Sequence, residues 1–262
     1  MNVVRKSKVI LFILFVAASL FVSKTALSQE IKFDANQFTN GEGEELNYRI
    51  LTPDYDTLRK YPLIVFLHGA GERGNDNRSQ LKWGVMNFAT DEMMSLHPAF
   101  VIAPQCPENQ WWSNFDHDRS SNSLKLKPEP SKPMRLMIDL VDHLKANFPI
   151  DADRIYITGL SMGGMGTFDA IVRYPDMFAA AVPVCGGGDP SKASEIAHIP
   201  IWVFHGAEDP TVSPALSSKM VEALTSAGGH PGFTLYPEVG HFAWLMAYSD
   251  HLMIEWMFRQ RK

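Results

Sequence analysis

Short apolar runs alternate with amphipathic segments along most of the chain. Six of these runs are largely continuous in their apolar character, and five of them end at a glycine; they occupy residues 61–69, 99–105, 154–159, 179–186, 199–206 and 232–240. Runs of this kind are typical of parallel strands that are buried on both faces. The pattern therefore predicts six strands of a mainly parallel sheet.

Between these runs, apolar residues recur every three or four positions, as on one face of a helix. Four such faces are formed by Leu136, Leu140 and Leu144; by Met165, Phe168 and Val172; by Leu216, Met220 and Leu224; and by Leu252 and Trp256. Strands that alternate with helices predict an α/β fold with a mainly parallel sheet. Residues 31–38 and 44–53 look like two more strands around the turn dipeptide Asn40-Gly41, and they could form an antiparallel edge.

One segment does not fit the alternation. Residues 106–133 contain three aromatic residues near their start and then a polar, proline-rich stretch, SSNSLKLKPEPSKP. A loop of this length in a compact domain is usually functional or disordered. We find no repeat and no linker that would divide the chain into two domains.

The first 28 residues have the pattern of a secretory signal peptide. Arg5, Lys6 and Lys8 precede a 14-residue apolar run, and Ala26 and Ser28 stand where the small residues of a cleavage site belong. A membrane span needs about 20 apolar residues, so the pattern favours a cleaved leader over an uncleaved anchor. We expect residues 1–28 to be removed, residues 29–262 to form a single domain, and the protein to be exported, either to the periplasm or as a secreted protein.

The net charge argues against nucleic-acid binding, and the two cysteines raise the question of a disulfide. Cleavage would leave 20 basic and 29 acidic side chains, a net charge of −9, which provides no basic footprint for nucleic acid. An exported protein could join its two cysteines, but Cys106 and Cys185 follow runs that are not expected to be neighbouring strands. Because bridged Cα atoms must lie within about 7 Å of each other, a disulfide is the less favoured expectation.

The stretch GLSMG, residues 159–163, matches the pattern G-x-S-x-G, with a strand-like run before it and a helical pattern after it. This strand–turn–helix context is the one that a nucleophile elbow requires. The flanking glycines permit a sharp turn, and the start of a helix favours a developing negative charge. The pattern makes Ser161 a candidate nucleophile.

A serine hydroxyl needs a base, and the base needs an orienting acid. His241 follows the last strand-like run and Asp209 follows the run before it. Catalytic groups of parallel sheets lie at the carboxyl ends of strands, and the order Ser161, Asp209, His241 is the order of the α/β-hydrolase arrangement. Glu208 is the alternative acid, but Asp209-Pro210 would fix the turn while Glu208 could remain a solvated loop charge.

Acyl transfer also needs two hydrogen-bond donors for the oxyanion. The backbone amides of Met162, which follows the nucleophile, and of Ala70, in the glycine-rich stretch HGAGERG, are the candidates. The alternative for this stretch is simply a flexible loop. His68 and His205 precede glycines at strand ends, and we expect them to hold loop backbone rather than to move protons.

Three tryptophans could line a substrate site. Trp111 and Trp112 follow a strand-like run and so start at the catalytic face, and Trp244 lies three residues after His241. Aromatic surfaces suit sugar rings or a phenolic acyl group. The competing interpretation is that either Trp111 or Trp112 covers the core.

Several segments together resemble the secreted α/β-hydrolase esterases related to carbohydrate esterase family 1: HGAGERG, APQCP followed by WW, GLSMGGMGTF, VCGGGDP, HGAEDPTV and VGH. That group includes feruloyl and acetyl-xylan esterases and proteins labelled as predicted peptidases of the prolyl-oligopeptidase type. The resemblance covers residues 61–262. It implies an eight-stranded-type sheet, a Ser161–Asp209–His241 triad, and neither a metal nor an organic cofactor.

The sequence thus favours a serine esterase that acts on a small-molecule or polysaccharide-derived ester, with feruloyl or acetyl esters of plant polysaccharides as substrates. A small serine peptidase, a general carboxylesterase or acyltransferase, and a non-catalytic binding module on the same fold are the alternatives. Only about 60 residues precede Tyr61, too few for the propeller domain of the large oligopeptidases.

Overall fold

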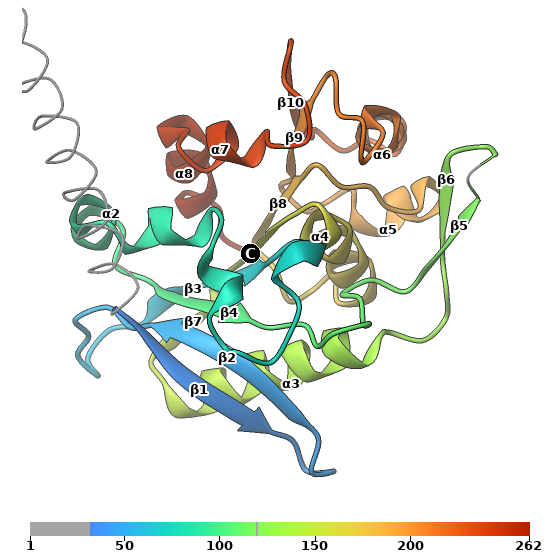
Figure 1. Ribbon diagram of the computed structural model, residues 1–262. Coiled ribbons are helices and arrows are strands. Elements are labelled where there is room, and N and C mark those ends of the chain that lie inside the picture. The colour runs from blue at the N-terminus through green and yellow to red at the C-terminus, as the bar shows by residue number, and fades with distance from the viewer. Residues whose placement is uncertain (1–31, 119) are drawn as a thin grey trace, which may run out of the picture.

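The computed structural model describes residues 32–118 and 120–262, and the expected signal peptide lies outside these residues. Its centre is an eight-stranded sheet with the order β1-β2-β4-β3-β7-β8-β9-β10 (Figure 1). The strands are β1 (Phe33–Thr39), β2 (Glu45–Leu51), β3 (Tyr61–Leu67), β4 (Phe100–Pro104), β7 (Ile150–Leu160), β8 (Ala180–Val184), β9 (Trp202–Gly206) and β10 (Gly232–Tyr236).

Six of the strands, from β4 to β10 in the sheet order, are mutually parallel, and β1 and β2 form an antiparallel edge beside β4. All six apolar runs are strands of the parallel part, and both N-terminal segments are strands of the edge. The fold class predicted from the sequence, an α/β-hydrolase fold with a mainly parallel eight-stranded sheet, is confirmed.

Helices cover both faces of the sheet. One face packs against α3 (Lys132–Asn147), α4 (Met162–Arg173), α5 (Ala193–Ile196) and α6 (Pro214–Ser226), and the other against α2 (Asp91–Leu96), α7 (Trp244–Ala247) and α8 (His251–Phe258). Along β3, Leu63, Val65 and Leu67 face the first core, and Ile64 and Phe66 face the second. This double burial explains why the strand sequences are apolar at every position.

The predicted face of α8, Leu252 and Trp256, is wrong at Leu252, whereas Trp256 is partly buried and packs against the core. Leu252 is 72% exposed, whereas Met253 and Met257 are buried in the core. The helix is apolar at most positions, so two different stripes fit the same spacing, and only packing against the sheet selects one.

Residues 106–133 are not a structureless loop. They contain a hairpin of β5 (Phe115–Asp118) and β6 (Ser123–Leu126), with Phe115 opposite Leu126. In Figure 1 this hairpin projects beyond the main sheet near α5 and α6. Lys219 on α6 donates to the carbonyl oxygens of Ser121 and Asn122 at 3.0 and 2.9 Å, which ties the hairpin to the domain.

Cys106 and Cys185 are free, buried thiols. They follow β4 and β8, which are separated in the sheet by β3 and β7, so at about 4.8 Å per strand they lie too far apart to be joined. Within the described ranges, no helix has both the length and the apolar character that crossing a membrane demands.

Candidate active site

Ser161 occupies the sharp turn between β7 and α4. Its φ of 56° and ψ of −114° lie in a region that non-glycine residues rarely adopt, as expected for a nucleophile elbow. Its amide donates to Val184 O at 2.8 Å, which anchors the turn to the neighbouring strand. A Cβ atom at Gly163 would overlap the carbonyl oxygen of Leu67, so α4 can start this close to β3 only with glycine there.

Three side chains from three strand ends meet at this turn. His241 Nε2 lies 2.9 Å from Ser161 Oγ, and His241 Nδ1 lies 2.6 Å from Asp209 Oδ2. Ser161 follows β7, Asp209 follows β9 and His241 follows β10, so residues 80 positions apart are brought together by the sheet order. The structure therefore brings together the three residues that the sequence predicted as a triad.

Asp209 is held as a carboxylate. Burial opposes its ionisation, but hydrogen bonds from His241 and from the amides of Val212 and Thr211 outweigh burial and lower the pKa of Asp209 below its ordinary value. Those two amides donate to Oδ1 at 3.0 and 2.8 Å, which leaves Oδ2 for His241. The alternative acid, Glu208, is an exposed residue and no hydrogen bond joins it to His241. The geometry thus selects Asp209.

The two amides nominated as oxyanion donors stand at the starts of neighbouring elements. Ala70 begins the short 3-10 helix Ala70–Glu72 after β3, and Met162 begins α4 after β7. In the part of the chain that the structure describes, neither amide donates to another protein group. Both are therefore free to donate to a ligand oxygen above Ser161.

His68 fixes the peptide that carries the Ala70 amide. Its Nε2 accepts from the Cys106 amide at 2.9 Å, so Nδ1 carries the hydrogen and donates to Gly69 O at 2.6 Å. Gly69 C=O and Ala70 N–H belong to one trans peptide group and point in opposite directions. Holding the carbonyl thus also orients the amide, which confirms that His68 holds loop backbone.

This arrangement predicts a loss of stability in acid. Burial lowers the pKa of His68 to about 4, against about 6.5 in an unfolded chain. Between these two values the unfolded state binds the proton and the folded state does not. The contribution of neutral His68 to the free energy of unfolding is therefore complete above pH 6.5 and falls as the pH drops towards 4, by about 3 kcal/mol in all. Urea unfolding at pH 7.0 and 4.5 measures the fall, and His68→Gln, which cannot titrate, should show a smaller one. An equal fall in both proteins would contradict the assignment.

The three candidate tryptophans have different environments. Trp112 is fully buried, and its Nε1 donates to His68 O at 3.1 Å, so it is a core residue and its nomination as a substrate contact is wrong. Trp244 is also buried, with its ring centroid 5.0 Å from that of His241, so it packs against the histidine, and its prediction as a substrate contact is wrong as well. Trp111 is 49% exposed beneath the Arg73 guanidinium and is the tryptophan that a ligand could reach.

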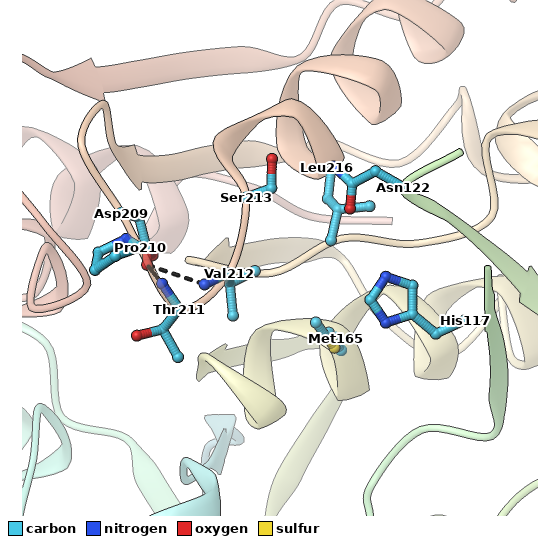
Figure 2. A pocket seen from close by; sticks show the side chains of 9 residues that line it. All are labelled: His117, Asn122, Met165, Asp209, Pro210, Thr211, Val212, Ser213 and Leu216. Atoms are coloured by element: carbon cyan, nitrogen blue, oxygen red, sulfur yellow. Dashed lines mark hydrogen bonds between the residues drawn. The ribbon is translucent and has the colours of Figure 1, made fainter. Parts of the chain in front are cut away.

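A pocket of about 320 Å³ adjoins Asp209. It is lined by His117, Asn122, Met165, Asp209, Pro210, Thr211, Val212, Ser213 and Leu216. Figure 2 shows Asp209 at one side of this pocket and His117 at the other, with Val212 and Met165 between them. The β5–β6 hairpin therefore supplies the far wall, which the sequence did not predict; the signal it offered was the apolar Leu124 and Leu126 within a polar stretch.

One group of side chains has the composition of a metal site. Potential ligand atoms of Cys185, His205 and Asp209 lie within 4.8 Å of one another. Both Asp209 oxygens already accept hydrogen bonds, both His205 nitrogens have partners, and burial raises the pKa of Cys185 to about 12. A thiol that stays protonated is a poor ligand, so these residues do not fit a metal.

Ser161 lies at a strained strand–helix turn and is hydrogen-bonded to His241, which a buried carboxylate orients. This arrangement defines a serine hydrolase of the α/β fold. The family model described as phospholipase/carboxylesterase matches residues 56–253, and the chain belongs to this family of carboxylic ester hydrolases.

Three known proteins show how the chain relates to others. A solved structure of a thermostable esterase is 43% identical, with a TM-score of 0.81, over 88% of this chain and 64% of that one. Poly(3-hydroxyalkanoate) depolymerase C of Paucimonas lemoignei is 27% identical over 64% of this chain and 45% of its own length. A bifunctional acetylxylan esterase/xylanase of Neocallimastix patriciarum is 24% identical over 66% of this chain and 23% of its own length. The chain thus spans less than two thirds of each of these relatives.

Proposed function

We propose that this carboxylesterase hydrolyses feruloyl or acetyl esters of plant polysaccharides through an acyl-enzyme on Ser161. His241 Nε2 takes the Ser161 proton as Oγ attacks the ester carbonyl carbon, and the amides of Ala70 and Met162 stabilise the oxyanion. The ester C–O bond then breaks, and His241 returns the proton to the departing alcohol. Water repeats the sequence on the acyl-enzyme and releases the acid.

The observation that carries this proposal is the continuous hydrogen-bonded chain from Asp209 Oδ2 through His241 to Ser161 Oγ. It supplies a nucleophile, a base and an orienting acid without a further group. The pairing of His241 Nδ1 with a carboxylate leaves Nε2 as the lone-pair nitrogen that faces the serine, which is the tautomer that a general base needs.

Of the two proposed acyl groups, feruloyl and acetyl, the pocket beside Asp209 favours the larger, aromatic one. Its size is at the lower end of ligand pockets, which suits one ring and its substituents and exceeds what an acetyl group fills. Apolar Met165 and Val212 would face the ring, and His117 and Asn122 could bond a phenolic hydroxyl. The resemblance to feruloyl esterases supports the aromatic acyl group, and the acetylxylan esterase relative supports esters of plant polysaccharides as the wider substrate class.

The test compares the purified enzyme on methyl ferulate, acetylated xylan, p-nitrophenyl acetate and an aminoacyl-nitroanilide. We expect turnover of the first three and a kcat/KM for methyl ferulate above that for acetylated xylan. Preferred cleavage of the nitroanilide would replace the esterase proposal with a peptidase.

Ser213→Phe tests the pocket separately. Ser213 lines the pocket and is the N-cap residue of α6, but its side chain makes no capping hydrogen bond, so a phenyl ring there fills space without removing such a bond. We expect kcat/KM for methyl ferulate to fall about tenfold, with p-nitrophenyl acetate changed less than about twofold. Ser213→Ala is the matched control and should leave both values unchanged. Equal losses on both substrates would show that the acyl group does not occupy this pocket.

The proposal includes export, supported by the charge and apolar pattern of residues 1–28. N-terminal sequencing of the protein recovered outside the cytoplasm should begin at Gln29. Recovery of an intact N-terminus with the cell membrane would instead support an anchor.

A further inference from the structure

His205 is a buried, titratable residue that the proposed mechanism does not use. It lies at the end of β9, four residues before Asp209, and it is fully buried. Its Nδ1 lies 2.7 Å from Ser217 Oγ on α6. Its Nε2 lies 3.0 Å from Val212 O and 3.2 Å from Asp209 Oδ2. The ring therefore links α6 to the turn that carries the catalytic carboxylate.

The partners of the ring place its hydrogen. A backbone carbonyl and a carboxylate only accept hydrogen bonds, so His205 Nε2 must carry the hydrogen that faces them. Burial lowers the pKa of His205, which keeps the ring neutral and leaves Nδ1 as an acceptor. The Ser217 hydroxyl then donates to Nδ1 and anchors the ring. Gly186 O lies 2.9 Å from Ser217 Oγ and is the alternative acceptor of the one hydroxyl hydrogen.

The same Nε2–H also holds the turn that carries Asp209, independently of the hydrogen bond from His241. Asp209 Oδ1 accepts from the Val212 amide, and His205 holds the Val212 carbonyl, so both polar groups of Val212 are fixed around the carboxylate. Asp209 Oδ2, the oxygen that meets His241 Nδ1, is also the one within 3.2 Å of His205. The other titratable groups here are His241 itself and the Cys185 thiol, which is neutral.

We propose that His205 is a positioning residue for catalysis: through Nε2–H it fixes the 209–212 turn and the rotation of the Asp209 carboxylate, so that Oδ2 stays aligned with His241. This inference rests on the triad roles assigned under the proposed function. It goes beyond holding loop backbone, because the loop held is the one that orients the base.

The decisive variants are His205→Gln and His205→Met. The two side chains have the same length, and the amide nitrogen of glutamine can reach the position of His205 Nε2, whereas methionine has no donor. We expect His205→Met to lower kcat/KM for p-nitrophenyl acetate about tenfold through kcat, with KM changed less than about twofold. His205→Gln should recover most of that loss, and thermal unfolding of both variants checks that they are folded.

A double-mutant cycle separates positioning from general structural support. If His205 acts through Asp209, then His205→Met should change kcat/KM less than about twofold when it is added to Asp209→Asn. A further tenfold loss in that background, or equal activity of the Gln and Met variants, would overturn the proposal.

Ser217→Ala covers the case in which His205→Met does not fold. It keeps the ring but removes the hydroxyl that anchors Nδ1, and it should lower kcat about threefold, with KM little changed. Unaltered kcat would overturn the proposal. Ser161→Ala is measured in parallel: if it retains wild-type turnover, the proposed function has failed, whereas an inactive Ser161→Ala beside a fully active His205→Met means that only the role of His205 has failed.

Discussion

Replacing Ser161 by alanine should lower kcat for p-nitrophenyl acetate by about 10⁴-fold or more. The reason is that no other nucleophilic side chain is bonded to His241 Nε2, which lies 2.9 Å from Ser161 Oγ. Activity that remains would come from the oxyanion amides and from substrate binding alone. Steady-state kinetics of the purified variant measures the loss.

Ser161→Gly is the control for folding. The φ of 56° at this position strains any side chain, and glycine adopts it freely, so this variant should be inactive yet at least as stable to heat as Ser161→Ala. Loss of activity with an unchanged melting curve assigns the effect to chemistry. Turnover near the wild-type level in either variant would remove Ser161 from the mechanism.

Replacing Asp209 by asparagine should lower kcat by about 10⁴-fold. An amide NH₂ at the position of Oδ2 donates to His241 Nδ1, which forces the hydrogen of the imidazole onto Nε2. That nitrogen then faces Ser161 Oγ with a hydrogen and cannot accept the serine proton. The kinetics of the variant on p-nitrophenyl acetate provide the measurement.

Glu208→Gln is the matched control, because Glu208 is the neighbouring carboxylate and is exposed to solvent. It should change kcat less than about twofold. The opposite outcome, a large loss in Glu208→Gln with an active Asp209→Asn, would transfer the role of the acid to Glu208.

The parallel part of the sheet and the position of the triad were predictable because both follow from short, local patterns of residues in the sequence. A strand buried on both faces must be apolar throughout, as β3 is, and the end of such a strand is where Ser161, Asp209 and His241 stand in the sequence. The choice of Asp209 over Glu208 also followed from local chemistry, since only the residue before Pro210 is fixed by the turn.

Features that depend on packing were not predictable in the same way. Trp111 and Trp112 are adjacent and chemically identical, yet only Trp112 finds an acceptor, His68 O, inside the core. Leu252 and Met253 are both apolar, and the sheet buries only Met253. Such choices are made by contacts between distant segments.

The β5–β6 hairpin is another feature that depends on packing and was not predicted from the sequence. Its strands are mostly polar, and their pairing is supported by distant residues such as Lys219 on α6 and Asp189, which accepts from the Leu126 amide at 3.0 Å. A periodicity of polar and apolar residues could not reveal these partners. The pocket beside Asp209 was therefore not predicted, because Leu124 and Leu126 were the only signal for its hairpin wall; the other wall, residues 209–213, contains the predicted acid.

The central claim is that Ser161 is the nucleophile of an acyl-enzyme, and covalent labelling tests it most directly. After incubation with a fluorophosphonate, intact-protein mass spectrometry should show one adduct per chain, and peptide mapping should place it on Ser161. Prior incubation with a slowly hydrolysed ester should block the label, and Ser161→Ala should remain unlabelled. An esterase that keeps turning over without labelling, or that is labelled at another residue, would contradict the account.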